Sequence, residues 1–180
     1  PAKWLADHAP DGFRLGIDPW LHTGAEVTRF ETALSEKGGS VVLLESNPLD
    51  PLWEGRPAEP LEPVILQPEN VTGIPATAKI ATIGEIVSAR KAQAVLVTDP
   101  SSIAWIFNIR GNDVPHTPHP LARAIIYADG KADLFVDERK VSDEVGAYLA
   151  PLATLLAPTE IAARLHAIAI NGDILIGQGL

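Results

Sequence analysis

The segment Val95–Pro120, VLVTDPSSIAWIFNIRGNDVPHTPHP, decides the fold of this chain and carries its most function-like residues. Its first residues, Val95–Thr98, predict a buried strand. Asp99 is a residue type that caps helices and Pro100 fits a first helical turn, so a short helix is predicted over residues 101–109. This helix has few polar residues, and we therefore expect it to be buried.

A polar loop, stiffened by three prolines, follows this helix from Arg110 to Pro120. It offers charges of both signs and two imidazoles, which can meet the polar backbone of a peptide. Arg110 and Asp113 are close enough in sequence either to form a loop-stabilising ion pair or to hold a peptide backbone. The candidate site residues of this loop are Arg110, Asn112, Asp113, His116 and His119.

The two histidines of this loop, His116 and His119, also raise the question of a metal site. Two imidazoles at this spacing can share an ion when a helix or a tight turn fixes them. Here prolines break any helix, and Asp113 is the only nearby carboxylate, so no metal site is predicted. The sequence holds no serine-nucleophile, phosphate-loop or zinc-protease motif, and no catalytic residue is predicted.

Composition limits the class of protein and of partner. Hydrophobic residues make up 46% of the 180 residues, which is enough for a packed core. A net charge of −9 disfavours nucleic acid and anionic membranes as partners, and the absence of cysteine excludes disulfides and thiolate chemistry. No apolar run approaches the ~20 residues of a transmembrane helix and no signal segment opens the chain, so a cytoplasmic location is expected.

Upstream of the central segment, the sequence predicts one βαβ unit and a connector. Residues 13–17 and Val41–Leu44 are strand candidates, and the second is continuously apolar, as in a parallel sheet covered on both faces. Between them, Thr23 and Glu26 form a capping box that begins a helix. Residues 48–75 hold seven prolines in 28 positions, which predicts an extended, semi-rigid interdomain connector.

Downstream of the connector, helices and strands are predicted in alternation. A helix begins near Ala76, and Gly84 inside it costs about 1 kcal/mol relative to alanine. Asp129-Gly130 predicts a hairpin turn, and a helix over residues 159–169 contains a Glu160–Arg164 pair at i, i+4. The remaining elements are a helix over 142–149 and strands over 153–157 and 174–176. This order describes an α/β layer fold with a mixed sheet.

Residues 101–118, SSIAWIFNIRGNDVPHTP, resemble the middle domain of Xaa-Pro aminopeptidases of the three-domain cytosolic type, the aminopeptidase P family. RLGIDPWLHT (14–23) with NPLDPLWEGRP (47–57), and AIIYADGKADLFVD (124–137), resemble further parts of that family in the same order. The resemblance implies a three-layer α/β/α sandwich with a mixed sheet, of the ribonuclease-H-like creatinase/prolidase N-terminal type, preceded by a partial α/β domain. Residues 1–66 then correspond to the end of a first such domain plus the linker, and residues 67–180 to the middle domain.

For function, the resemblance implies a non-catalytic N-terminal segment of a metallo-aminopeptidase that releases the N-terminal residue from Xaa-Pro peptides. The family's catalytic "pita-bread" domain, with two Asp, one His and two Glu around two manganese or similar divalent ions, is expected beyond Leu180. The expected partners are that domain, the peptide substrate and a second copy in a homodimer. The segment alone is expected to be inactive, with a role in assembly and in substrate access. The expected substrate-access rim consists of Arg110, Asn112, Asp113, His116 and His119.

Two other functions are left open. The first is an independent α/β module that binds a small ligand or a protein at the Asp99–Arg110 edge, because open sheets commonly bind ligands at strand ends. The second is a creatine- or dipeptide-cleaving relative. It is disfavoured because those relatives have one such domain, whereas this chain resembles parts of two.

Overall fold

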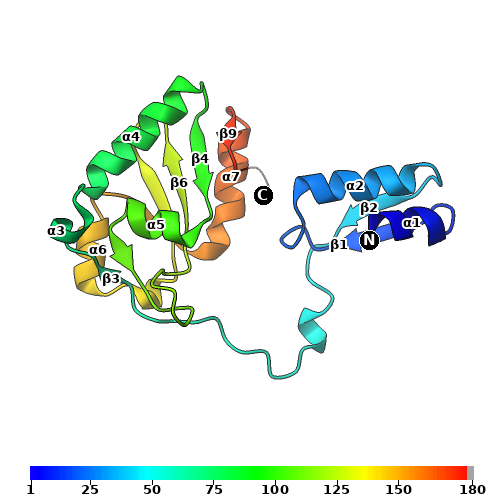
Figure 1. The fold of residues 1–180 in the computed structure, drawn as a ribbon, viewed down its shortest axis with the longest axis horizontal. Coiled ribbons are helices and arrows are strands. Elements are labelled where there is room, and N and C mark those ends of the chain that lie inside the picture. Colours follow the sequence, from blue (N-terminus) through cyan, green and yellow to red (C-terminus); the bar gives the residue numbers. More distant parts are fainter. Residues whose placement is uncertain (178–180) are drawn as a thin grey trace. The chain divides into compact units, whose positions relative to one another are not determined.

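A computed structural model describes residues 1–177 of the chain (Figure 1). These residues form two compact units, Pro1–Ala58 and Glu59–Gly177, and each unit is described by itself. The division falls earlier than the boundary expected after residue 66. The physical reason is Val64, which is 3% exposed in the core of the second unit and donates its backbone N–H to the Lys140 carbonyl at 2.8 Å.

The first unit is the predicted βαβ arrangement with one more helix before it. Its elements are α1 (Ala2–His8), β1 (Arg14–Ile17), α2 (Gly24–Ser35) and β2 (Ser40–Leu43). The capping box is confirmed: Glu26 N donates to Thr23 Oγ1 at 3.2 Å, and Thr23 N donates to Glu26 Oε2 at 3.0 Å. The strands β1 and β2 pair in parallel, as predicted.

The burial of β2 differs from the prediction. A continuously apolar strand predicted cover on both faces, yet Leu43 is 60% exposed. The buried residues of this unit form one small cluster, Leu5, Ala9 and Leu34, packed by Phe13, Leu15, Phe30 and Val41. Two strands and two helices supply enough side chains for a single layer of core, so one face of the pair stays open within this unit.

The connector is largely irregular, as its prolines predict. It contains a short 3₁₀ turn, η1 (Asp50–Leu52), a two-residue strand, β3 (Ile65–Leu66), and one helical turn, α3 (Glu69–Thr72). The strand β3 pairs antiparallel with β5 (Ile109–Arg110), which places the end of the connector beside the start of the candidate loop.

A five-stranded sheet in the order β8-β7-β6-β4-β9 forms the centre of the second unit. The strands are β4 (Ala94–Val97), β6 (Arg123–Tyr127), β7 (Ala132–Phe135), β8 (Thr154–Leu156) and β9 (Ile174–Leu175). The β4–β6 and β6–β7 pairs are antiparallel, whereas β7–β8 and β4–β9 are parallel. The mixed sheet and the hairpin turn at Asp129-Gly130 are therefore confirmed.

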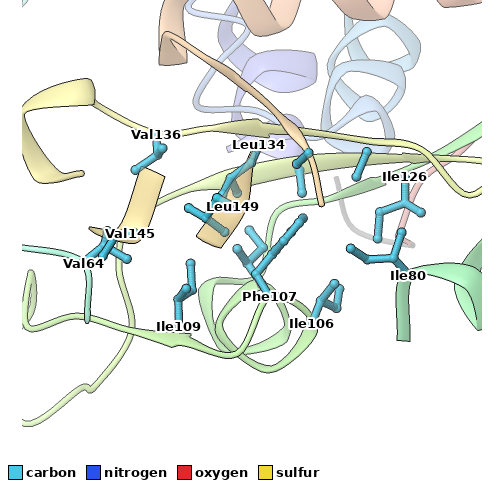
Figure 2. Packing of buried hydrophobic residues seen from close by; sticks show 14 residues of the cluster. Val64, Ile80, Ile106, Phe107, Ile109, Ile126, Leu134, Val136, Val145 and Leu149 are labelled. Atoms are coloured by element: carbon cyan, nitrogen blue, oxygen red, sulfur yellow. The ribbon is translucent and has the colours of Figure 1, made fainter. Parts of the chain in front are cut away.

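Helices cover both faces of this sheet and complete the three layers. The helices α4 (Ala76–Ala89), α5 (Pro100–Ile106) and α6 (Asp143–Leu149) pack on one face, and α7 (Ile161–Ala169) packs on the other. Strand residues alternate accordingly: Ala124 and Ile126 join the first core, while Ile125 joins the second. Figure 2 shows the first core, with Phe107 reaching from the end of α5 toward the sheet.

Gly84 has a packing reason that its helix propensity does not reveal. A Cβ atom added there would lie 3.0 Å from the Tyr127 carbonyl oxygen and 3.1 Å from the Gly130 backbone nitrogen. Only glycine lets α4 approach the β6–β7 hairpin this closely, so its low helix propensity is offset by helix–sheet packing.

The predicted Glu160–Arg164 ion pair is wrong. Arg164 Nε donates to Asp133 Oδ2 at 2.7 Å, and Glu160 Oε1 instead accepts from the Ala157 N–H at 2.9 Å. The Asp133 side chain is 4% exposed and also accepts from the Tyr127 hydroxyl at 2.6 Å. The buried Asp133 carboxylate attracts the Arg164 guanidinium more strongly than the exposed Glu160 carboxylate does, because water screens a buried charge less.

Candidate functional site

The helix α5 begins as predicted and ends earlier than predicted. Asp99 Oδ2 accepts the Ser102 N–H at 2.8 Å and the hydroxyls of Ser101 and Ser102 at 2.5 and 2.7 Å. These hydrogen bonds, that from the Ser101 hydroxyl first, lower the pKa of Asp99 to about 2. The helix ends at Ile106 because Asn108 adopts a left-handed conformation with φ of 53°, which asparagine tolerates.

A buried lysine fixes this helix end. Lys79, 3% exposed on α4, donates from Nζ to the Trp105 carbonyl at 2.6 Å and to Asn108 Oδ1 at 2.7 Å. Its ammonium also lies 4.2 Å from the centre of the Trp105 ring. Burial, and secondarily the positive charge of Arg110, lower the pKa of Lys79. Asn108 in turn donates from Nδ2 to the Ile74 carbonyl at 3.0 Å.

Arg110 binds backbone carbonyls of its own segment. Its Nη1 donates to the carbonyl of Ile109 at 2.8 Å and to that of Ala104 at 3.1 Å, and its backbone pairs with Ile65 of β3. The half-buried guanidinium thus supplies donors and positive charge at the carboxyl end of α5, where the helix dipole favours cations. The ion-pair alternative for Arg110 and Asp113 is wrong, because Asp113 pairs with another residue.

That residue is Lys140, which no sequence motif indicated. The Asp113 side chain is 0% exposed and the Lys140 side chain 2% exposed, and their charged groups form a direct ion pair through Asp113 Oδ2. The same carboxylate oxygen accepts the Leu121 N–H at 2.6 Å, and Lys140 Nζ donates to the Leu121 carbonyl at 3.2 Å. Asp113 is therefore a buried anchor of the loop rather than part of its surface.

Contacts inside the loop hold it in a doubled-back shape. Gly111 N–H donates to the Pro118 carbonyl at 3.4 Å, and Thr117 N–H donates to the Val114 carbonyl at 3.0 Å. A Cβ atom on Gly111 would lie 2.9 Å from Pro120 Cα, so glycine is needed for this close approach. His116 sits at the turn with φ of 61°.

The structure separates the five candidate rim residues by exposure. Asn112 and His116 are exposed, Arg110 and His119 are half-buried, and Asp113 is buried. Asp113 Oδ1 and His119 Nδ1 are buried without a hydrogen-bond partner, a need that an ordered water can meet. Across residues 1–177, no group of three or more His, Cys, Asp or Glu side chains is arranged to hold a metal ion.

A concavity that the sequence did not indicate lies where the parallel strands β7 and β8 end. It has a volume of about 820 Å³ and is lined by both apolar and charged residues, among them Asp137, Glu138, Arg139, Asp143 and Glu160. Arg139 Nη2 donates to Asp137 Oδ2 at 2.6 Å, and the hydrogen bonds from Arg139 lower the pKa of Asp137 to about 2.

Residues 55–179 match the family model described as the creatinase/prolidase N-terminal domain. The chain belongs to the creatinase/prolidase N-terminal domain family. Its fold agrees with that of an X-prolyl aminopeptidase from Caenorhabditis elegans, described as a cytosolic enzyme with a di-nuclear active site. The TM-score is 0.84 at 24% identity, over 97% of this chain and 29% of the other. The predicted fold class and family are confirmed.

Curated relatives of this family member are probable Xaa-Pro aminopeptidases P. The relative from Talaromyces marneffei is 31% identical over 96% of this chain and 26% of its own length. The relative from Sordaria macrospora is 37% identical over 87% of this chain, again 26% of its own length. The chain thus spans about a quarter of the relatives it matches. No helix among residues 1–177 is both long and apolar enough to cross a membrane.

Proposed function

We propose that the chain is a non-catalytic N-terminal and middle segment of an Xaa-Pro aminopeptidase, which removes the first residue from peptides with proline second. This proposal is supported by relatives with that name, which match nearly the whole chain. The chain spans only 26% of the length of these relatives. The chemistry then resides in a further domain, which is the first partner of this segment. A homodimer and a cytoplasmic location complete the proposal.

The parent enzyme is proposed to bind two manganese or similar divalent ions, in keeping with the di-nuclear site named for the Caenorhabditis elegans enzyme. Such ions lower the pKa of bound water and polarise the scissile carbonyl. The described residues of this chain do not fit such a site, because they offer no cluster of three or more ligating side chains. No step of the chemistry is therefore assigned to them.

The role proposed for this segment is to form a rim for peptide access through the loop 110–120. The observation that carries this role is the contrast between buried and exposed residues within the loop. Asp113 and Arg110 are bound to protein groups, whereas Asn112 and His116 are exposed. A loop already held in one shape loses little conformational entropy when a peptide binds, so each contact contributes more affinity.

The substitution Asn112→Ala in the full-length enzyme tests this role, with Asn171→Ala as the matched control. Both asparagines are exposed, but Asn171 lies beyond α7 and donates to the Ala167 carbonyl. We expect Asn112→Ala to lower kcat/KM severalfold for long Xaa-Pro peptides, to leave an Xaa-Pro dipeptide unaffected, and to leave Tm unchanged. Equal kinetics for the two variants on every peptide length would refute the rim.

The alternative of an independent binding module is supported by the concavity at the ends of β7 and β8, since ligands bind at the carboxyl ends of strands in open sheets. The Asp99–Arg110 edge is less suited, because the Asp99 carboxylate is occupied by its capping bonds. The module alternative is tested by titrating the ¹⁵N-labelled chain with free amino acids and short peptides and following the amide chemical shifts by NMR. Shifts confined to Gly146 and Ala147, which line the concavity, would favour the module.

A further inference from the structure

Lys140 lies outside the predicted rim, yet its atoms join three separate segments. Its ammonium binds Asp113 in the middle of the loop and the Leu121 carbonyl just beyond the loop, the latter at 3.2 Å. Its backbone carbonyl accepts the N–H of Val64, in the connector, at 2.8 Å. One residue therefore ties the loop to the connector at a point where both are buried.

We propose that Lys140 is a positioning residue that sets the shape in which the loop 110–120 meets a peptide. The proposal rests on the rim function proposed above and names the residue that controls it. Because the Lys140 side chain is 2% exposed, it acts through Asp113 and Leu121 rather than by touching a peptide.

The loop has two fixed ends, and Lys140 accounts for one of them. The first end is fixed by the β3–β5 pairing, in which Ile65 lies opposite Arg110. The second end is fixed at Leu121, whose N–H binds the Asp113 carboxylate at 2.6 Å and whose carbonyl binds Lys140. Without the ammonium, Asp113 keeps only the Leu121 N–H among the donors that the structure describes. The middle and the far end of the loop would then be released together.

A simpler explanation is that Lys140 merely neutralises a buried acid and so contributes stability alone. The pair formed by Asp133 and Arg164 separates the two explanations. Asp133 is also a buried carboxylate with one cationic partner, but it joins β7 to α7, and within residues 1–177 its side chain bonds only Arg164 and Tyr127, neither of which is in the loop. General destabilisation should appear equally in variants of both pairs, whereas a positioning effect should appear only in variants of Lys140.

The test compares Lys140→Met with Arg164→Met in the full-length enzyme, and adds the double variant Asp113→Asn/Lys140→Met. The double variant removes the uncompensated charge, so it keeps the test valid if Lys140→Met fails to fold. Two quantities are measured: amide hydrogen exchange at Gly111, Thr117 and Leu121, and kcat/KM for an Xaa-Pro dipeptide and for a long Xaa-Pro peptide.

We expect both Lys140 variants to exchange these loop amides at least about tenfold faster, because their hydrogen bonds depend on the anchored loop. We expect kcat/KM for the long peptide to fall about ten- to a hundredfold, as a displaced binding group does, with the dipeptide within about twofold. Arg164→Met should change neither the loop exchange nor the ratio between the two peptides.

The outcomes that refute the proposal are distinct from those that refute the rim function. If amide hydrogen exchange in the loop is unchanged in the Lys140 variants, the positioning role is overturned. The rim function is then judged by Asn112→Ala alone. Faster loop exchange with unchanged kinetics on both peptides overturns the rim function, and with it the effect of Lys140 on substrate. Equal kinetic losses for Lys140→Met and Arg164→Met show a stability effect only and also overturn the proposal.

Discussion

The substitution Lys79→Met removes a buried ammonium while keeping a side chain of similar length. Two buried acceptors, the Trp105 carbonyl and Asn108 Oδ1, then lose their donor at a cost of about 1–3 kcal/mol each. The contact with the Trp105 ring, at 4.2 Å, is lost at a further cost of about 0.5–1 kcal/mol. The Lys79 ammonium has no carboxylate partner among the described residues, so removal of this buried charge recovers part of the loss.

We therefore expect Lys79→Met to lower the free energy of unfolding by about 2–3 kcal/mol at pH 7. This corresponds to a fall in Tm of about 5–10 °C for a chain of this size. The assay is urea unfolding followed by the fluorescence of the tryptophans, with Lys131→Met as the control. Lys131 forms an exposed ion pair with Asp129, and its side chain is 81% exposed, so its loss should change stability very little.

The pH dependence of stability gives a sharper test, because the pKa of Lys79 is lowered and that of Lys131 is raised. Burial lowers the folded-state pKa of Lys79, so between that pKa and the unfolded value of 10.5 the unfolded state binds more protons. The contribution of Lys79 to the free energy of unfolding is then fully present above pH 10.5 and is lost as the pH falls through the folded-state pKa. The deficit of Lys79→Met relative to the unsubstituted chain should therefore grow as pH rises toward 10.5.

For Lys131 the sign is reversed. The hydrogen bond with Asp129 raises its pKa, so its contribution is fully present below 10.5 and is lost as pH rises through the folded value. A stability deficit of Lys79→Met that stays constant or shrinks toward pH 10.5 would contradict the account of a buried, destabilised ammonium. So would a variant as stable as the unsubstituted chain at pH 7.

Three further outcomes are expected. Asp99→Ala should lower the free energy of unfolding by about 1 kcal/mol through loss of the α5 cap, whereas Asp99→Asn should keep most of the capping contribution. In thermal melts the contribution of Asp99 should be present above pH 3.8 and be lost as the pH falls through about 2. Gly84→Ala should destabilise by about 1–2 kcal/mol because its Cβ meets the hairpin. Gly146→Ala in α6 should stabilise by up to about 1 kcal/mol in the same melts, because its Cβ would make only an ordinary contact with Val141 Cγ1 at 3.7 Å. Arg164→Met should cost about 2–3 kcal/mol in urea unfolding by leaving Asp133 buried without its cation, and Asp133→Asn/Arg164→Met should recover part of it.

The features that the sequence predicted correctly are those with a local cause. The Thr23 capping box, the Asp99 cap and the Asp129-Gly130 turn each depend on residues two to four positions apart, and all three are present. Together with the order of the elements, these local signals were sufficient to predict the layered α/β fold.

The contacts that shape the candidate site were not predicted, because each joins residues far apart in the chain. Lys79 binds Asn108 29 residues away, Lys140 binds Asp113 27 residues away, and Arg164 binds Asp133 31 residues away. The partner of a charged residue at such a separation is decided by the packing of whole elements. One signal was nevertheless present: Lys79 lies three residues after Ala76, on the apolar face of α4, where a lysine needs a buried partner.

The two buried lysines bear on why the loop is built in this way. A loop that only joined α5 to β6 could be closed by apolar contacts, since buried ion pairs seldom add stability over hydrophobic packing of equal volume. Here Lys79 fixes the turn before the loop and Lys140 fixes its middle and far end, so the loop is held on both sides by directional bonds. Directional bonds fix a shape more narrowly than apolar contacts do. A loop held by buried residues that also exposes Asn112 and His116 is what the rim proposed above requires, and under that proposal the buried charges serve the shape of the loop more than its stability.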